Sequence, residues 1–164
     1  MNSTFKLAIA KLAKATILSV GLTLIASPAF SHDDETLDKM KSPNGGQVRM
    51  AGMYHFELVM NKESKGQKEE TLTIYVTDHI ANKIATKGAA GTATILSGKN
   101  KTTVKLMEDG DNKLKASAKY VANANVKVVL AITMEGKPVE QARYTPFKVV
   151  KDAEKKKEHE GHVH

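Results

Sequence analysis

Hydrophobic side chains recur at every second position over most of the chain. Such alternation places successive side chains on opposite faces of a β-strand, whereas a helix would repeat them every 3.6 residues. The pattern predicts roughly seven strands, the number typical of an antiparallel sandwich, and they cover residues 53–60, 71–77, 92–97, 102–107, 114–120, 126–134 and 139–147. We therefore predict an all-β, antiparallel immunoglobulin-like β-sandwich, with a small barrel as the alternative.

The segments around the predicted strands set the limits of this domain. Residues 32–44 are polar and end in a Pro-Asn-Gly-Gly turn, which predicts a flexible leader. The charged stretch 61–70 indicates a long, exposed hairpin loop. We expect the folded domain over residues 45–147, followed by a charged, His-containing tail over residues 148–164.

The N-terminal residues have the composition of a targeting segment. Three lysines precede an uncharged, largely apolar run over residues 15–26, and the small residues Ala29 and Ser31 follow it. This arrangement predicts a secretory signal peptide over residues 1–31, with cleavage after Ser31. The apolar run is well short of the roughly 20 residues that a membrane-spanning helix needs, so we expect no membrane span after cleavage. A secreted protein without cysteine points to the bacterial periplasm.

The net charge of the mature chain is lower than that of the full sequence, because the predicted signal peptide carries three lysines. The 25 basic and 18 acidic residues give a formal net charge of +7. Loss of Lys6, Lys11 and Lys14 leaves 22 basic residues against the same 18 acidic ones, a net charge of +4. This modest excess argues against nucleic acid as a partner.

The chain has no cysteine, which excludes a disulfide scaffold, a thiolate zinc site, an iron–sulfur cluster and a cysteine nucleophile. It also has no G-x-S-x-G motif, no complete phosphate-binding loop and no H-E-x-x-H zinc motif. We therefore expect a protein that is not an enzyme. Its capacity to bind soft metal ions rests with six histidines and seven methionines.

Met50, Met53 and His55 form the first group with metal-binding chemistry. On a strand, Met53 and His55 point to the same face, and a turn at residues 51–52 can bring Met50 back toward them. Thioether sulfur and imidazole nitrogen together suit Cu(I). The alternative is that the methionines pack in the core while His55 forms a hydrogen bond at an edge of the sheet.

Histidines near the ends of the mature chain form two further groups. Cleavage after residue 31 would make His32 the first residue, whose amine and imidazole can chelate Cu(II) with help from the neighbouring aspartates. The alternative is an ordinary residue of a polar leader. In the tail, His159, His162 and His164 can wrap around Cu(II), Ni(II) or Zn(II).

The sixth histidine, His79, directly follows Asp78 at the end of a predicted strand. An Asp-His pair at such a position is more often a turn cap than a metal ligand. We therefore leave His79 out of the predicted ligand set.

Six segments of the domain together resemble a small periplasmic β-sandwich module that is found with heavy-metal efflux adaptor proteins. The resemblance covers about residues 44–147 and rests on GGQV (45–48), YHFELV (54–59), LTIYVTDH (72–79), GTAT (91–94), GDNKL (110–114) and VKVVL (126–130). It implies a non-enzymatic part in metal handling, with His55 and His79 at the recurring Tyr-His and Asp-His positions. The chain lacks the helical hairpin and lipoyl-like segments of a full adaptor, which argues against a direct pump-bridging role.

These observations lead to two hypotheses from different classes. The first is a periplasmic metal-binding protein, for copper before nickel, zinc or cobalt, that buffers the ion or hands it to an efflux system, with a periplasmic efflux adaptor protein as the expected partner. The alternative is an immunoglobulin-like interaction module that binds a protein partner through a sheet edge or face and has no metal role.

Overall fold

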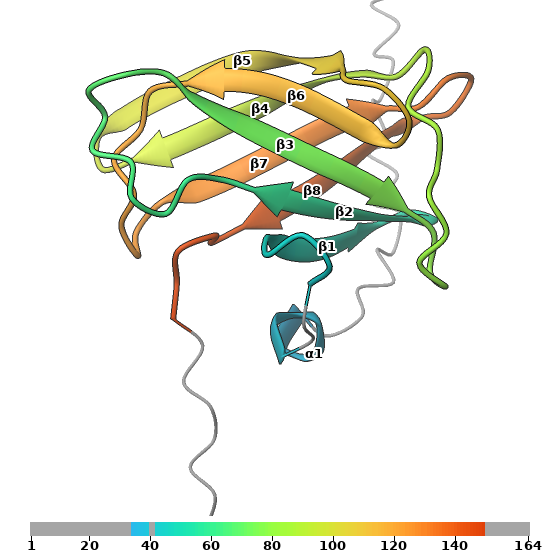
Figure 1. Cartoon of the computed structure of the whole chain (residues 1–164), viewed down its shortest axis with the longest axis horizontal. Coiled ribbons are helices and arrows are strands. Elements are labelled where there is room, and N and C mark those ends of the chain that lie inside the picture. Colours follow the sequence, from blue (N-terminus) through green and yellow to red (C-terminus); the bar gives the residue numbers. More distant parts are fainter. Residues whose placement is uncertain (1–33, 40–41, 150–164) are drawn as a thin grey trace, which may run out of the picture.

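The computed structural model describes residues 34–39 and 42–149, which form one short helix and eight strands (Figure 1). The helix is α1 (Asp34–Lys39), and the strands are β1 (Gln47–Ala51), β2 (Tyr54–Val59), β3 (Glu70–Thr77), β4 (Ala90–Ser97), β5 (Asn100–Glu108), β6 (Lys113–Ala118), β7 (Lys127–Thr133) and β8 (Val139–Tyr144). The described residues include no helix with the length and apolar character of a membrane-spanning segment.

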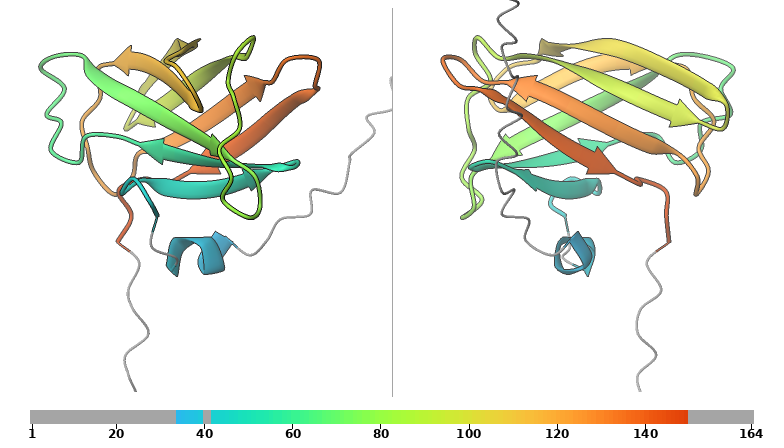
Figure 2. Two further views of the ribbon diagram at one scale, coloured as in Figure 1. Left: turned by 45° about the vertical axis from the view of Figure 1, so that its right-hand side comes forward. Right: turned by 180° about the vertical axis from the view of Figure 1, so that it is seen from behind.

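All eight strands belong to one antiparallel sheet with the order β1-β2-β3-β6-β5-β4-β7-β8. The two outermost strands, β1 and β8, lie next to each other, so the sheet curls almost into a barrel (Figure 2). The predicted all-β, antiparallel class is confirmed. The predicted immunoglobulin-like sandwich of seven strands is not confirmed, and the observed shape lies closer to the small barrel.

The strand that the hydrophobic pattern did not predict is β1. Its buried positions are occupied by Arg49 and Ala51, so the alternation of large apolar residues is broken there. The strand forms nevertheless because it pairs along its whole length with β2, from Gln47 opposite Leu58 to Ala51 opposite Tyr54.

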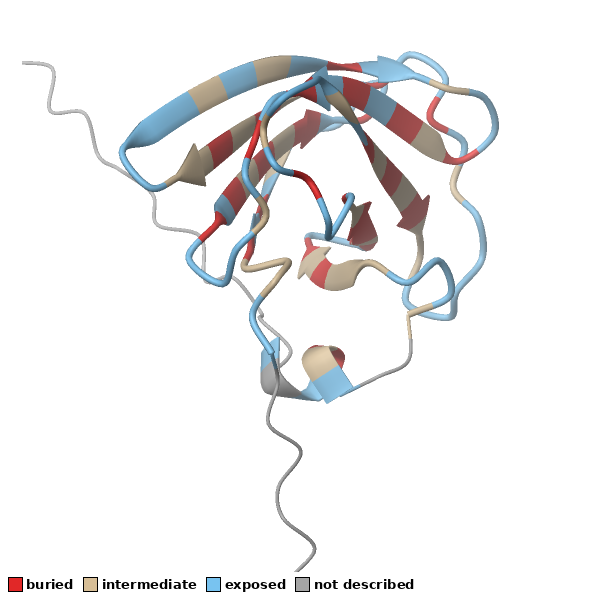
Figure 3. Ribbon diagram, turned by 60° about the vertical axis from the view of Figure 1, so that its left-hand side comes forward, coloured by how far each residue is buried: buried red, intermediate tan, exposed pale blue. Residues whose placement is uncertain are grey.

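The core fills the inside of the curled sheet. Buried and exposed residues alternate along the strands, as the period of two requires (Figure 3). The hydroxyl of Tyr144 donates a hydrogen bond of 2.9 Å to the carbonyl oxygen of Phe56, and burial raises the pKa of Tyr144. The largest fully buried side chains are Tyr144, Phe56, Leu58, Leu72, Ile74, Ile95, Leu114, Leu130, Ile132, Val76, Val126 and Val128.

The helix α1 lies within residues 32–44, for which the sequence predicted a flexible leader. It is joined to the sheet through Arg49, whose Nη1 and Nη2 donate to the two carboxylate oxygens of Asp38 at 2.7 and 3.0 Å. Arg49 Nε also lies 3.4 Å from a carboxylate oxygen of Asp34. Desolvation acts to raise the pKa of Asp38, but hydrogen bonds from Arg49 and Gln47 outweigh it and hold this pKa below its usual range. The buried guanidinium of Arg49 thus lies beside two carboxylates, those of Asp34 and Asp38.

Candidate metal centre

Two histidines that are distant in sequence meet on the outer surface of the sheet. His55 lies on β2, directly opposite Thr77 of β3. His79 follows two residues after Thr77, just beyond the end of that strand. His79 lies in the turn that follows β3, and this turn brings its ring to the side of the sheet on which His55 lies.

The two imidazole rings face each other through their nitrogens. His79 Nδ1 lies 3.2 Å from His55 Nε2. The rings meet edge to face, with centroids 4.9 Å apart and planes at 88°. In the neutral state one of these nitrogens carries a proton and the other presents a lone pair. The pair therefore places two ring nitrogens, each of a type that can bind a metal ion, at hydrogen-bond distance from each other.

Asp78 fixes the loop that carries His79. One oxygen of its carboxylate accepts the backbone N–H groups of Ile80 and Asn82 at 3.0 and 2.8 Å, and the other accepts the Asn82 side-chain amide at 2.9 Å. Desolvation acts to raise the pKa of Asp78, but the hydrogen bonds from Asn82 and Ile80 and the charge of His79 outweigh it, so this pKa lies below its usual range. The expected turn cap is present, and the residue that forms it is Asp78.

Met50 is the cross-strand neighbour of His55. The two residues are directly opposite each other in the β1–β2 pair, and such residues carry their side chains on the same face with Cβ atoms roughly 4.5–5.5 Å apart. The flexible thioether of Met50 can therefore reach the imidazole pair. Met53 lies in the turn before β2, where the sequence predicted a strand residue, and it is 58% exposed.

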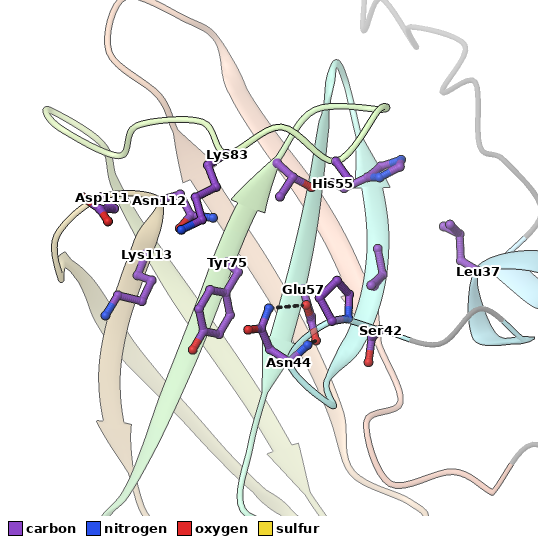
Figure 4. A pocket seen from close by; sticks show the side chains of 14 residues that line it. Leu37, Ser42, Asn44, His55, Glu57, Tyr75, Lys83, Asp111, Asn112 and Lys113 are labelled. Atoms are coloured by element: carbon purple, nitrogen blue, oxygen red, sulfur yellow. Dashed lines mark hydrogen bonds between the residues drawn. The ribbon is translucent and has the colours of Figure 1, made fainter.

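A groove of about 640 Å³ opens beside His55 on the same outer surface. Tyr75 lies between Lys113 of β6 and Glu57 of β2 on its floor, as Figure 4 shows. The segment from Ser42 to Asn44 borders one side. His55 is thus accessible to a small ion or ligand that enters from this groove.

Glu57, the carboxylate nearest to His55 on β2, is occupied by other partners. Its oxygens accept the backbone N–H groups of Asn44 and Gly46, both at 2.9 Å, and the Asn44 side-chain amide at 2.8 Å. The described residues hold no group of three or more His, Asp and Glu side chains placed to bind a metal ion. Among the described residues, the thioether of Met50, opposite His55 in the strand register, is a candidate third donor for the imidazole pair.

Four of the predicted ligands lie outside the described residues. They are His32, His159, His162 and His164. Of the predicted set, the structure places Met50 opposite His55 and Met53 in the turn between β1 and β2, and it places His79 beside His55.

The role of His79 was missed because its immediate context predicted a cap. A usable signal was present: Tyr75, Thr77 and His79 occupy alternate positions opposite the buried Ile74 and Val76. To place His79 beside His55, however, one needs the register of β2 against β3. The loop of ten residues between these strands leaves that register open at the level of sequence.

Comparisons of this chain with known protein families, with curated proteins and with solved structures found no match. The function is therefore argued from the site itself.

Proposed function

We propose that this protein binds a transition-metal ion, copper before zinc, nickel or cobalt, between His55 and His79. The observation that carries the proposal is the 3.2 Å separation of the two facing ring nitrogens. Two imidazole nitrogens at roughly 2.0–2.1 Å from one ion, with an angle of about 100–110° at the ion, lie roughly 3.1–3.4 Å apart. The pair therefore has the nitrogen spacing of two metal ligands before any ion is added.

In this proposal the ion takes the place of the shared proton. Each ring nitrogen of the contact supplies a lone pair: the ring that accepts in the neutral pair already carries its proton on its other nitrogen, and the ring that donates moves its proton there. Asp78 keeps His79 in place through the bonds that it accepts from Ile80 and Asn82. The site thus requires a change of tautomer and no rearrangement of the strands.

The neighbouring thioether favours copper in its reduced state. Met50 offers a soft sulfur, which Cu(I) prefers and which contributes little to Zn(II) binding by imidazoles. With two nitrogens and one sulfur, the protein leaves room on the side of the groove for a further ligand. Such an open position suits buffering of the ion or its transfer to a periplasmic efflux system, which we propose as the biological role.

The first experiment isolates the barrel site from the other histidines. In a full-length variant carrying H32S, H159S, H162S and H164S, His55 and His79 are the two histidines that remain of the six. Titration with Cu(I) without oxygen, followed by nitrogen-15 resonances of the imidazoles and by the methionine methyl groups, is expected to show binding of about one equivalent. The shifts should be confined to His55, His79 and the methyl group of Met50.

Single substitutions then assign the donors. In this background H55Q and H79Q should each weaken Cu(I) binding by more than the roughly 10–100-fold that loss of a hydrogen-bond partner behind a ligand costs. M50L conserves volume and should weaken Cu(I) binding while leaving Zn(II) binding unchanged. The matched control M53L, in the exposed turn, should change neither.

A folded four-serine variant that binds no Cu(I) or Zn(II) would contradict the proposal. So would binding that survives both H55Q and H79Q. Binding by the parent chain that the serine substitutions abolish would assign metal contact to the termini and remove it from the barrel.

A further inference from the structure

One side of β5 has no partner strand over most of its length in the described part of the chain. Residues 100–106 pair with residues 91–97 of β4 on the other side. β6 pairs with β5 only at Met107 and Glu108. After β6 the chain pairs at Val121 with Lys65, and the Val121 carbonyl accepts a hydrogen bond of 3.3 Å from Ser97 Oγ beside the start of β5, without a strand pair to residues 100–106. Alternate residues of a strand direct their N–H and C=O groups to its two sides. The open side of residues 100–106 is therefore a template for another strand.

Every charged side chain on this open stretch is a lysine. Lys101 and Lys105 are exposed on the outer face, with Thr103 between them. Lys119 lines a small cavity of about 140 Å³ between the start of β5 and the chain after β6. Within residues 34–39 and 42–149, none of these lysines forms an ion pair with a carboxylate.

The positive character continues over the neighbouring strands. We call the outward-facing residues of β5, β4, β7 and β8 the basic face. On it, Leu96 lies between Lys101 and Lys127 in the strand register, and Val129 pairs with Arg143. The two carboxylates of these strands, Glu108 of β5 and Glu140 of β8, lie at the alternate positions that do not belong to this face, and neither forms an ion pair with its described cations. An approaching chain thus meets cations that are not neutralised within the barrel.

We propose that the open side of β5 binds an extended, acidic segment of a protein partner by strand addition. Backbone hydrogen bonds to residues 100–106 supply the attachment, and side chains at alternate positions supply selectivity. Acidic residues four positions apart in the incoming strand would face Lys105 and Lys101, with a small or β-branched residue between them opposite Thr103. A segment of about seven residues, roughly 23 Å long, is sufficient.

The same charges disfavour a second copy of this chain at the edge. Antiparallel pairing of two β5 strands centred on Thr103 would place Lys101 of one copy opposite Lys105 of the other. Like charges directly opposite each other destabilise a strand pair. The lysines therefore reject self-association and select a partner of opposite charge.

The test uses the full chain and three synthetic peptides that differ in charge alone. The sequence Thr-Glu-Val-Thr-Val-Glu-Thr, blocked at both ends, has carboxylates four positions apart, and its counterparts carry Gln or Lys in place of Glu. Amide resonances and hydrogen exchange of residues 100–106 report strand addition directly. The Glu peptide is expected to bind about tenfold or more tightly than the Lys peptide and to protect alternate amides of this stretch, with an affinity that falls as salt is added.

Charge reversal provides the decisive comparison. The double variant K101E/K105E should prefer the Lys peptide to the Glu peptide. The control K62E/K87E, which makes the same change of net charge on exposed loops, should keep the preference of the parent chain.

Three results would overturn the proposal. One is binding of none of the peptides, which would leave the lysines with the sole role of keeping the edge unpaired. Another is an unchanged preference in K101E/K105E. The third is retention on phosphatidylglycerol vesicles without peptide protection of residues 100–106, which would assign the basic face to a lipid surface. Because no metal is added, these results are independent of the proposed metal site.

Discussion

The barrel has two outer faces that differ in whether their charged and polar side chains have partners. On the face formed by β1, β2, β3 and β6, several charged and polar side chains have partners: Glu57 accepts three N–H groups, Lys113 and Lys115 lie 3.4 and 3.6 Å from Asp109, and the two imidazoles meet at 3.2 Å. On the basic face, the described cations form no ion pair with a carboxylate, and a contact between the hydroxyls of Thr94 and Thr103 at 3.0 Å joins two neighbouring strands.

This difference indicates two kinds of recognition. Partnered groups are held in one geometry, which suits a small ion whose ligands must be placed to within a few tenths of an ångström. Cations without partners on flexible stems attract opposite charge over a Debye length of about 8–10 Å and adapt to it on contact. The two proposals thus assign a fixed arrangement of side chains to one face of the sheet and an adaptable one to the other.

The largest effect is expected from breaking the network on the first face. E57A leaves the N–H groups of Asn44 and Gly46 without their acceptor, and we expect a loss of about 3 kcal/mol in the free energy of unfolding, measured by urea denaturation. E57Q retains one carbonyl oxygen and should lose about half as much. A loss below about 1 kcal/mol for E57A would show that water replaces the carboxylate without cost.

A second test asks whether the Asp78 cap is needed to hold His79 in its position beside His55. D78A removes the acceptor of the Ile80 and Asn82 N–H groups, so His79 is no longer fixed, and metal affinity in the four-serine variant should fall by roughly 10–100-fold. D78N keeps one oxygen for these N–H groups and should retain most of the affinity. Equal affinities for D78A and the parent would mean that the loop holds its shape without this cap.

A smaller effect concerns the pH dependence of α1. The pKa of Asp38 is lowered in the folded state, so its contribution to stability is present above the ordinary value of about 3.9 and is lost as pH falls through the lower folded pKa. The parent chain should therefore lose stability on acidification below about pH 4, and D38N should lose less. Thermal unfolding at a series of pH values, with D152N as a control of equal charge change, measures this difference. Identical pH profiles for D38N and the parent would remove Asp38 as the cause.

The smallest effect is expected on the basic face. T94V removes one hydroxyl of the Thr94–Thr103 contact while keeping the branched shape, and it should change stability by at most about 0.5 kcal/mol. A double-mutant cycle with T103V measures the coupling. A coupling energy well above about 1 kcal/mol would contradict the view that this face is not held together by its side chains.

The fold class could be predicted because burial has a period of two along most strands. Leu72, Ile74 and Val76 are all fully buried, as the alternation required. The number of strands could not be obtained in the same way, because β1 places Arg49 where the pattern demands an apolar residue. Arg49 is buried there beside Asp34 and Asp38 of α1, and these aspartates lie outside β1 and do not enter the hydrophobic pattern of that strand.

The sequence predicted part of the candidate site, namely the residues whose proximity depends on short-range geometry. Met50 and His55 are joined by a tight turn, so their proximity follows from short-range geometry. His79 depends on the pairing of two strands across a long loop, and no local rule fixes how such strands align. Glu57 was not among the predicted site residues, and its carboxylate accepts hydrogen bonds from the turn before β1.

His55 and His79 are 24 residues apart in the chain, and only the pairing of β2 with β3 joins them. A chain that has not yet folded possesses no assembled pair, so an ion bound there distinguishes folded molecules from unfolded ones. An ion at a hundredfold excess over its Kd would stabilise the folded state by about 2.7 kcal/mol. Under the proposed function, the barrel would therefore take up its ion only after the pairing of β2 with β3 has formed.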